Sequence, residues 1–87
     1  MVTLTKEELQ MFRDIEIAEI LKVPRGRRVM LRCPFHNERT PSFLLDERNG
    51  YYCFGCGKKG SGALDFCRDM GYTFRESLEQ LAIYLKV

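Results

Sequence analysis

Apolar residues change their spacing twice along the chain. In residues 5–22 they recur every three or four positions, the period of a helix with one buried face, and Thr5 with Glu8 forms a capping box at the start. In residues 27–57 apolar and polar residues alternate, as in strands with one buried face, and after residue 63 the helical spacing returns. The pattern predicts a helical pair at 5–22, a β-rich segment at 27–57 and C-terminal helices at 63–85.

The middle segment predicts three strands. Residues 27–32, 42–45 and 51–54 are short runs rich in apolar side chains, and Asn49-Gly50 between the last two is typical of a hairpin turn. The loop at 57–62 is rich in glycine, and we expect it to be irregular. The expected fold is therefore α+β, with a small three-stranded antiparallel sheet flanked by N- and C-terminal helices.

With 87 residues the chain is expected to form one domain, residues 1–87, with a small core. Glu7 and Glu8 interrupt the N-terminal region, so we expect no signal peptide, and no segment approaches the ~20 apolar residues that span a bilayer. A cytoplasmic location follows as an expectation. In that reducing compartment, metal binding is a better interpretation of the four cysteines than disulfide formation.

Two ligand pairs have the spacing of a metal site. They are Cys33-x-x-His36, which holds the one histidine of the chain, and Cys53-x-x-Cys56. The predicted hairpin returns the chain to its starting point, so both pairs can meet at one end of the sheet. Three thiolates and one imidazole suit tetrahedral Zn²⁺, and four protein ligands would close the site. We expect one structural Zn²⁺ that stabilises a small core.

Other interpretations of the cysteines are weaker. A redox role for Cys53 and Cys56 would place the pair at the start of a helix, whereas a glycine-rich loop follows it. Iron is chemically possible but fits this ligand set less well. Cys67 lies at helical spacing beside Phe66 and Met70, so we expect it to be a small core residue.

The net charge of +2 hides an uneven distribution. Residues 21–60 carry nine basic and three acidic residues, whereas residues 1–20 carry two basic and five acidic ones. Basic side chains and two aromatic residues on strand faces in the middle segment could neutralise phosphates and stack on bases. The candidate nucleic-acid contacts are Arg25, Arg27, Arg28, Arg32, Arg39, Tyr52, Phe54, Lys58 and Lys59. For Tyr52 and Phe54 a place in the core is an equally good interpretation.

The stretches CPFHNERTPSF and YYCFGCG, followed by a glycine-containing loop and LDF, resemble the N-terminal zinc-binding domain of bacterial and phage primases of the DnaG type. The resemblance covers nearly the whole chain. Two positions depart from the family pattern. The loop after Cys56 is one residue longer, with Ser61-Gly62 in place of the usual Asn or Asp, and Cys67 stands where a larger apolar residue is usual.

The resemblance implies a zinc ribbon that engages single-stranded template DNA and helps a separate polymerase domain choose where an RNA primer starts. The carboxylate cluster of that polymerase domain is not found in this sequence, so we expect no catalytic residue here. The chain would be the non-catalytic domain of a DNA primase, a DNA-directed RNA polymerase.

The partners implied are the template strand, a primase polymerase domain in cis or in trans, and the replicative helicase through the rest of the primase, with no membrane. The setting would be the cytoplasm of a bacterium or a phage-infected cell. An alternative from another class is a stand-alone zinc ribbon that acts as a protein-interaction or regulatory module.

Overall fold

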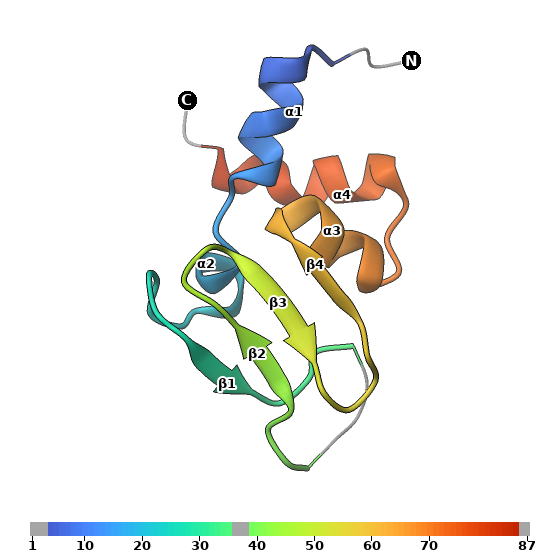
Figure 1. Ribbon diagram of the computed structural model, residues 1–87. Helices are drawn as coiled ribbons and strands as arrows, with labels where there is room; N and C mark the ends of the chain where they lie inside the picture. Colours follow the sequence, from blue (N-terminus) through green and yellow to red (C-terminus); the bar gives the residue numbers. More distant parts are fainter. Residues whose placement is uncertain (1–3, 36–38, 86–87) are drawn as a thin grey trace.

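A computed structural model describes residues 4–35 and 39–85 and shows four helices, a four-stranded sheet and a short 3₁₀ helix within them (Figure 1). The helices are α1 (Lys6–Arg13), α2 (Ile17–Leu21), α3 (Gly62–Asp69), α4 (Phe74–Leu81) and the 3₁₀ helix η1 (Ala82–Tyr84). The strands are β1 (Val29–Leu31), β2 (Phe43–Leu45), β3 (Gly50–Cys53) and β4 (Lys59–Ser61). Over the described residues, no helix combines the length and apolar character that crossing a membrane requires.

The residues at the helix ends adopt the capping and helix-ending conformations that the sequence suggests. The hydroxyl of Thr5 accepts the N–H of Glu8 while the Glu8 carboxylate accepts the N–H of Thr5, and Thr73 with Glu76 repeats the arrangement at α4. Gly71 follows α3 with a φ of +97°, a conformation that stops the helix and favours glycine. The sequence predicts capping boxes at Thr5 and Thr73 and a helix end at Gly71, and all three are confirmed.

The sheet is antiparallel throughout, in the order β1-β2-β3-β4. The α+β prediction is confirmed, but the count of three strands is wrong, because β4 lies in the segment predicted to be an irregular loop. Gly60 allows this strand to pair closely with β3: a Cβ there would lie 2.6 Å from the hydroxyl oxygen of Tyr51. The glycine that suggested a loop is therefore what lets β4 join the sheet.

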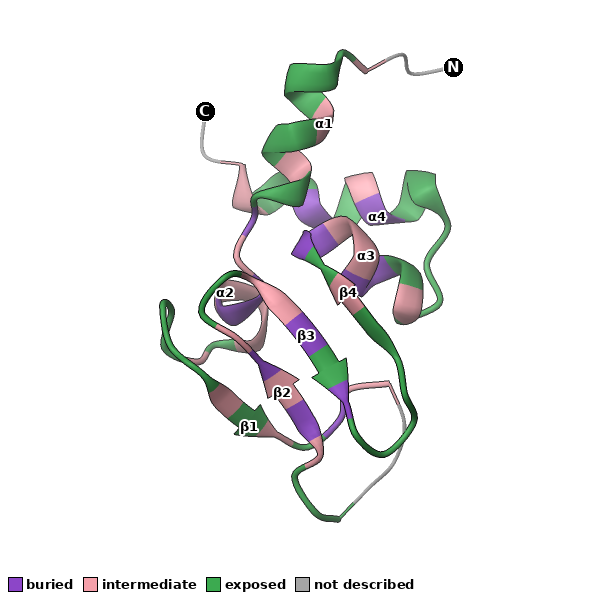
Figure 2. Ribbon diagram, in the orientation of Figure 1, coloured by how far each residue is buried: buried purple, intermediate pink, exposed green. Residues whose placement is uncertain are grey.

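Helices cover one face of the sheet and leave the other open. Phe43, Leu45 and Tyr51 are buried in one cluster with Ile17 of α2 and Phe66 of α3. Figure 2 shows buried positions on β2, β3, α2 and α3. Phe35 completes this cluster, with its ring centroid between 5.4 and 5.6 Å from those of its three aromatic neighbours. The sequence predicts core positions for Phe43 and Tyr51, and their burial confirms both.

A second apolar cluster joins the helices to one another above the sheet (Figure 1). Ile15, Ala63, Cys67 and Leu81 form its centre, so the core position predicted for Cys67 is confirmed. The apolar spacing of Phe74, Leu78 and Leu81 predicts that this stripe of the last helix belongs to the core. Leu81 is buried, but the prediction is wrong for Phe74, because this first residue of α4 is 55% exposed.

Candidate metal centre and nucleic-acid interface

Three thiols meet at one end of the sheet. Cys33 lies two residues after the end of β1, Cys53 is the last residue of β3, and Cys56 is in the turn between β3 and β4. The register Leu31–Phe43–Cys53 places the ends of β1 and β3 level with each other across β2. As a result, the three sulfur atoms all lie within 4.8 Å of one another.

The backbone folds toward the sulfur atoms at both Cys positions that begin a ligand pair. The N–H of Phe35 donates to Cys33 Sγ and the N–H of Cys56 donates to Cys53 Sγ, each at 3.4 Å. Gly57 closes the second turn by donating its N–H to the Cys53 carbonyl at 2.8 Å, with a φ of +78° that favours glycine. These turns offer donors to a negatively charged sulfur.

The electrostatic settings of the buried thiols differ. Burial raises the pKa of the Cys33 thiol, and the N–H of Phe35 offsets only part of that rise. Burial also opposes ionisation of Cys53, but hydrogen bonds from Ser42 Oγ, at 3.5 Å, and from the N–H of Cys56 outweigh it and lower the Cys53 pKa. Cys53 is therefore the more acidic of the two, and a divalent cation would favour the thiolate form at both.

The thiol cluster fits zinc. Tetrahedral Zn–S bonds of about 2.3 Å place two ligating sulfurs about 3.8 Å apart, and Cys33 Sγ lies 3.9 Å from Cys56 Sγ. Soft thiolate donors at this spacing suit Zn²⁺ better than Mg²⁺ or Ca²⁺, which prefer oxygen. His36, the expected fourth ligand, lies outside the described residues.

The open face of the sheet carries an unbroken row of side chains. The register aligns Met30, Leu44, Tyr52 and Lys59, one from each strand, on this face. Met30 is 47% exposed and Tyr52 39% exposed. Phe54 follows β3, is 66% exposed, and contacts Tyr52 edge-to-face with ring centroids 4.8 Å apart. Of the two interpretations considered for these aromatic rings, the core one is wrong.

Basic side chains flank this row at its β1 edge. Arg28 and Arg32 precede and follow β1, both residues are exposed, and Arg28 Nε lies 3.5 Å from Glu47 Oε2 in an exposed ion pair. Arg27 is exposed just before Arg28, and Arg39 is exposed in the segment that leads to β2.

Two of the candidate nucleic-acid contacts, Arg25 and Lys58, lie away from the open row. Arg25 lines a groove beside α2 together with Glu19 and Tyr84. Lys58 makes contacts within the chain: its Nζ lies 5.3 Å from the centre of the Phe35 ring and donates to the Asp69 carbonyl at 3.0 Å.

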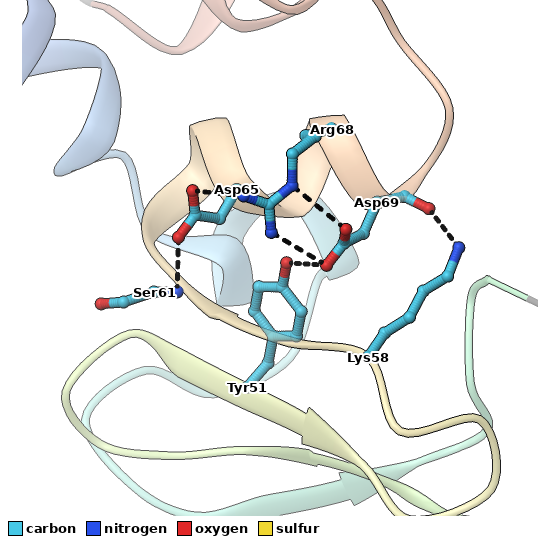
Figure 3. A network of polar contacts seen from close by, with 6 residues as sticks. All are labelled: Tyr51, Lys58, Ser61, Asp65, Arg68 and Asp69. Carbon is cyan, nitrogen blue, oxygen red and sulfur yellow. Dashed lines mark hydrogen bonds and ion pairs between the residues drawn. The ribbon is translucent and has the colours of Figure 1, made fainter.

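Lys58 belongs to a polar network that ties the sheet to α3 (Figure 3). The buried Tyr51 hydroxyl donates to Asp69 Oδ2 at 2.5 Å, and Arg68 Nε donates to the other carboxylate oxygen at 3.2 Å. Burial opposes ionisation of Asp69, but these two donors outweigh it and lower its pKa. The position of Lys58 thus has a structural explanation that the sequence did not suggest.

Three residues of these sites are not among the candidates that the sequence predicts. Ser42 reaches Cys53 Sγ, and Met30 and Leu44 form the middle of the open row. Strand alternation could have identified Met30 and Leu44, since both lie between inward-facing neighbours. Nothing in the sequence pattern indicates the contact of Ser42.

Comparison with known proteins gives one family and a consistent set of relatives. The model of the CHC2 zinc finger family matches residues 5–87. The DNA primase of Escherichia coli K12 is 42% identical over 73 residues, which are 79% of this chain and 12% of that protein. The DNA primase of Halalkalibacterium halodurans is 41% identical over 83 residues, 90% of this chain and 14% of that protein. The chain thus spans only a small part of the length of these relatives.

Proposed function

The chain belongs to the CHC2 zinc finger family, and from this premise we propose that it binds single-stranded template DNA for a DNA primase and helps select where the RNA primer starts. Its role is recognition, and the polymerase chemistry belongs to a separate domain in cis or in trans. The replicative helicase would be reached through the rest of the primase, in the cytoplasm of a bacterium or a phage-infected cell.

His36 is proposed as the fourth zinc ligand, beside Cys33, Cys53 and Cys56. With four protein ligands the metal is structural, because no position stays open for water or substrate. The ion fixes the end of the sheet from which Phe54 projects, one residue after Cys53. Zinc therefore supports template binding by fixing the conformation of the open face.

The observation that carries the proposal is the open row Met30–Leu44–Tyr52–Lys59 with Phe54 beside it. Monomeric sheets usually keep exposed faces polar, so apolar and aromatic side chains on three neighbouring strands, β1 to β3, indicate a binding surface. Flat π faces suit unpaired bases, whose stacking on aromatic side chains is worth ~1–3 kcal/mol per base. Duplex DNA hides those faces, so the surface favours single strands.

The flanking cations supply the phosphate contacts. Arg28 and Arg32 lie at the edge of the row, and Lys59 ends it on β4. Each phosphate neutralised on single-stranded DNA adds about 0.7 to the slope of log K against log salt. Binding should therefore weaken steeply as salt rises.

Fluorescence anisotropy with a labelled single-stranded oligonucleotide tests the cationic edge. The double variant Arg28→Ala/Arg32→Ala should bind more weakly and with a salt slope lower by about 1.4. The matched control is Lys6→Ala/Arg75→Ala, which removes two exposed cations from α1 and α4 and should leave both quantities near wild type. Equal affinity in the two double variants would refute the assigned edge.

The aromatic surface has its own matched pair of variants. Tyr52→Ala/Phe54→Ala removes the exposed rings of the sheet, and Tyr72→Ala/Phe74→Ala removes two rings of similar exposure from the α3–α4 region. Only the first should lose affinity, by roughly tenfold or more if one base stacks on each ring. If the zinc-loaded protein binds no oligonucleotide at low salt, the alternative of a protein-interaction or regulatory module is favoured.

A further inference from the structure

A groove of about 360 Å³ lies between α1, α2 and the C-terminal segment after α4, away from the open face of the sheet. Its floor is apolar: Met11 is 50% exposed, and Tyr84 and Leu85 are half-buried. Its other lining residues are mostly acidic. The lining of the groove includes Met11, Asp14, Glu16, Glu19, Tyr84 and Leu85.

The carboxylates at this groove lack cationic partners. Within residues 4–35 and 39–85, neither Glu16 nor Glu19 forms an ion pair, although both are half-buried. Asp14 accepts a hydrogen bond from Gln10 at 2.7 Å, which leaves its charge uncompensated. Arg25 is the one basic residue among the described residues that line the groove, against three acidic ones.

None of the described residues that line the groove belongs to the sheet. Ile17 and Ala18 of this helix pack into the core on the covered face of the sheet, whereas Glu16 and Glu19 line the groove. A molecule in the groove would therefore leave the Tyr52–Phe54 surface free. The two surfaces also differ in charge, since the cations gather on the sheet side.

We propose that this groove binds a basic amphipathic segment of a partner protein, with an apolar side chain on Met11, Tyr84 and Leu85 and Lys or Arg side chains toward Glu16 and Glu19. Charge complementarity carries the choice of occupant. Nucleic acid would be repelled by the carboxylates. A second copy of the chain, placed symmetrically, would bring the same acidic side chains face to face.

Two short peptides test the proposal with the zinc-loaded chain. One is an amphipathic peptide of Leu, Ala and Lys, and the other has Glu in place of every Lys. The Lys peptide should bind at low salt and shift the backbone amide NMR signals of Met11, Glu16, Glu19 and Leu85, while the Glu peptide should not bind. Shifts confined to other surfaces would overturn the assignment, and so would the absence of binding by the Lys peptide.

Variants that remove acidic side chains distinguish binding of the Lys peptide in the groove from a general attraction between opposite charges. Glu16→Gln/Glu19→Gln should weaken binding of the Lys peptide roughly three- to tenfold, as expected for two partly exposed ion pairs. Glu7→Gln/Glu79→Gln removes two exposed carboxylates from α1 and α4 and should leave affinity unchanged. An equal loss of affinity for the Lys peptide in both double variants would refute the proposal. Peptide-free dimerisation that shifts the groove signals would instead assign the groove to a second copy and overturn the proposed partner.

Discussion

The side chain of Asn49 accepts the backbone N–H of Ile17 at 2.8 Å, across 32 positions of sequence. Its amide also donates to the Ile15 carbonyl at 2.9 Å, so one side chain satisfies two backbone groups where the chain passes from α1 to α2. The backbone of Asn49 adds a third link by accepting the N–H of Gly62 at 2.9 Å. The turn between β2 and β3 therefore holds the helical pair and the start of α3 together.

Asn49 also has a φ of +65°, which allows its side-chain and backbone roles to be separated by mutation. Asn49→Gly keeps the backbone conformation but loses both side-chain hydrogen bonds, and should lower the free energy of unfolding by about 1–3 kcal/mol. Asn49→Ala should lower the free energy of unfolding by roughly a further 1 kcal/mol, because alanine disfavours positive φ. Urea unfolding followed by circular dichroism measures both. Equal stability of the glycine variant and the wild type would show that the side-chain bonds contribute nothing.

Gly62 begins α3 against the last residue of α1. Its φ is +84°, and a Cβ there would lie 2.7 Å from the carbonyl oxygen of Arg13, a backbone atom that cannot move aside cheaply. Gly62→Ala should therefore destabilise the fold by more than the ~1–2 kcal/mol of unfavourable φ alone. Gly26→Ala is the control, since Gly26 has a φ of +75° with open space around it. Similar losses in the two variants, measured by urea unfolding, would contradict a clash at Arg13.

The sequence predicts the elements whose formation depends on local pattern. Strand alternation and the turn signal at Asn49-Gly50 place β2 and β3, and the cysteines meet because Cys33 follows β1 and Cys53 ends β3 at the same end of the sheet. Strand β4 was missed because its three residues, Lys59–Ser61, have no apolar alternation. It forms because β3 offers an unpaired edge and Gly60 fits beneath Tyr51.

Contacts between distant elements determine the side-chain positions that local pattern does not predict. Helical spacing predicts that Phe74 is buried, but as the first residue of α4 it is 55% exposed. Ser77 is buried instead, and its hydroxyl donates to the carbonyl of Thr73, the N-cap residue of α4. The contacts of Lys58 with Phe35 and Asp69 likewise depend on how α3 packs against the sheet.

Zinc removal should unfold the sheet, since the metal would join Cys33, which follows β1, to Cys53 and Cys56 at the end of β3. Metal analysis by mass spectrometry should give one zinc per chain, and a strong chelator should abolish the circular dichroism signal of the folded state. Cys33→Ser should lose zinc, whereas Cys67→Ser should keep it, because Cys67 is buried in the separate cluster beneath α4. A folded, metal-free wild-type chain would contradict the structural role.

The bond from Tyr51 to Asp69 predicts how stability changes in alkaline solution. Burial raises the pKa of the Tyr51 phenol, and hydrogen bonding to the Asp69 carboxylate raises it further. The folded chain therefore keeps a proton that the unfolded chain releases near pH ~10. The stabilisation is complete below that pH and is lost as pH rises toward the folded-state pKa. The free energy of unfolding should accordingly fall above pH ~10.

Two conservative variants isolate this effect. Tyr51→Phe should lose about 1.5–3 kcal/mol at neutral pH, as for a hydrogen bond to a charged group, and should show a weaker fall in stability above pH ~10. Tyr72→Phe, which removes an exposed phenol, should behave as wild type in both respects. Ultraviolet titration of the phenolate band should show one tyrosine that ionises later than the others in the wild type and no such tyrosine in Tyr51→Phe. If Tyr51 ionises together with the exposed tyrosines, its bond to Asp69 does not hold the proton.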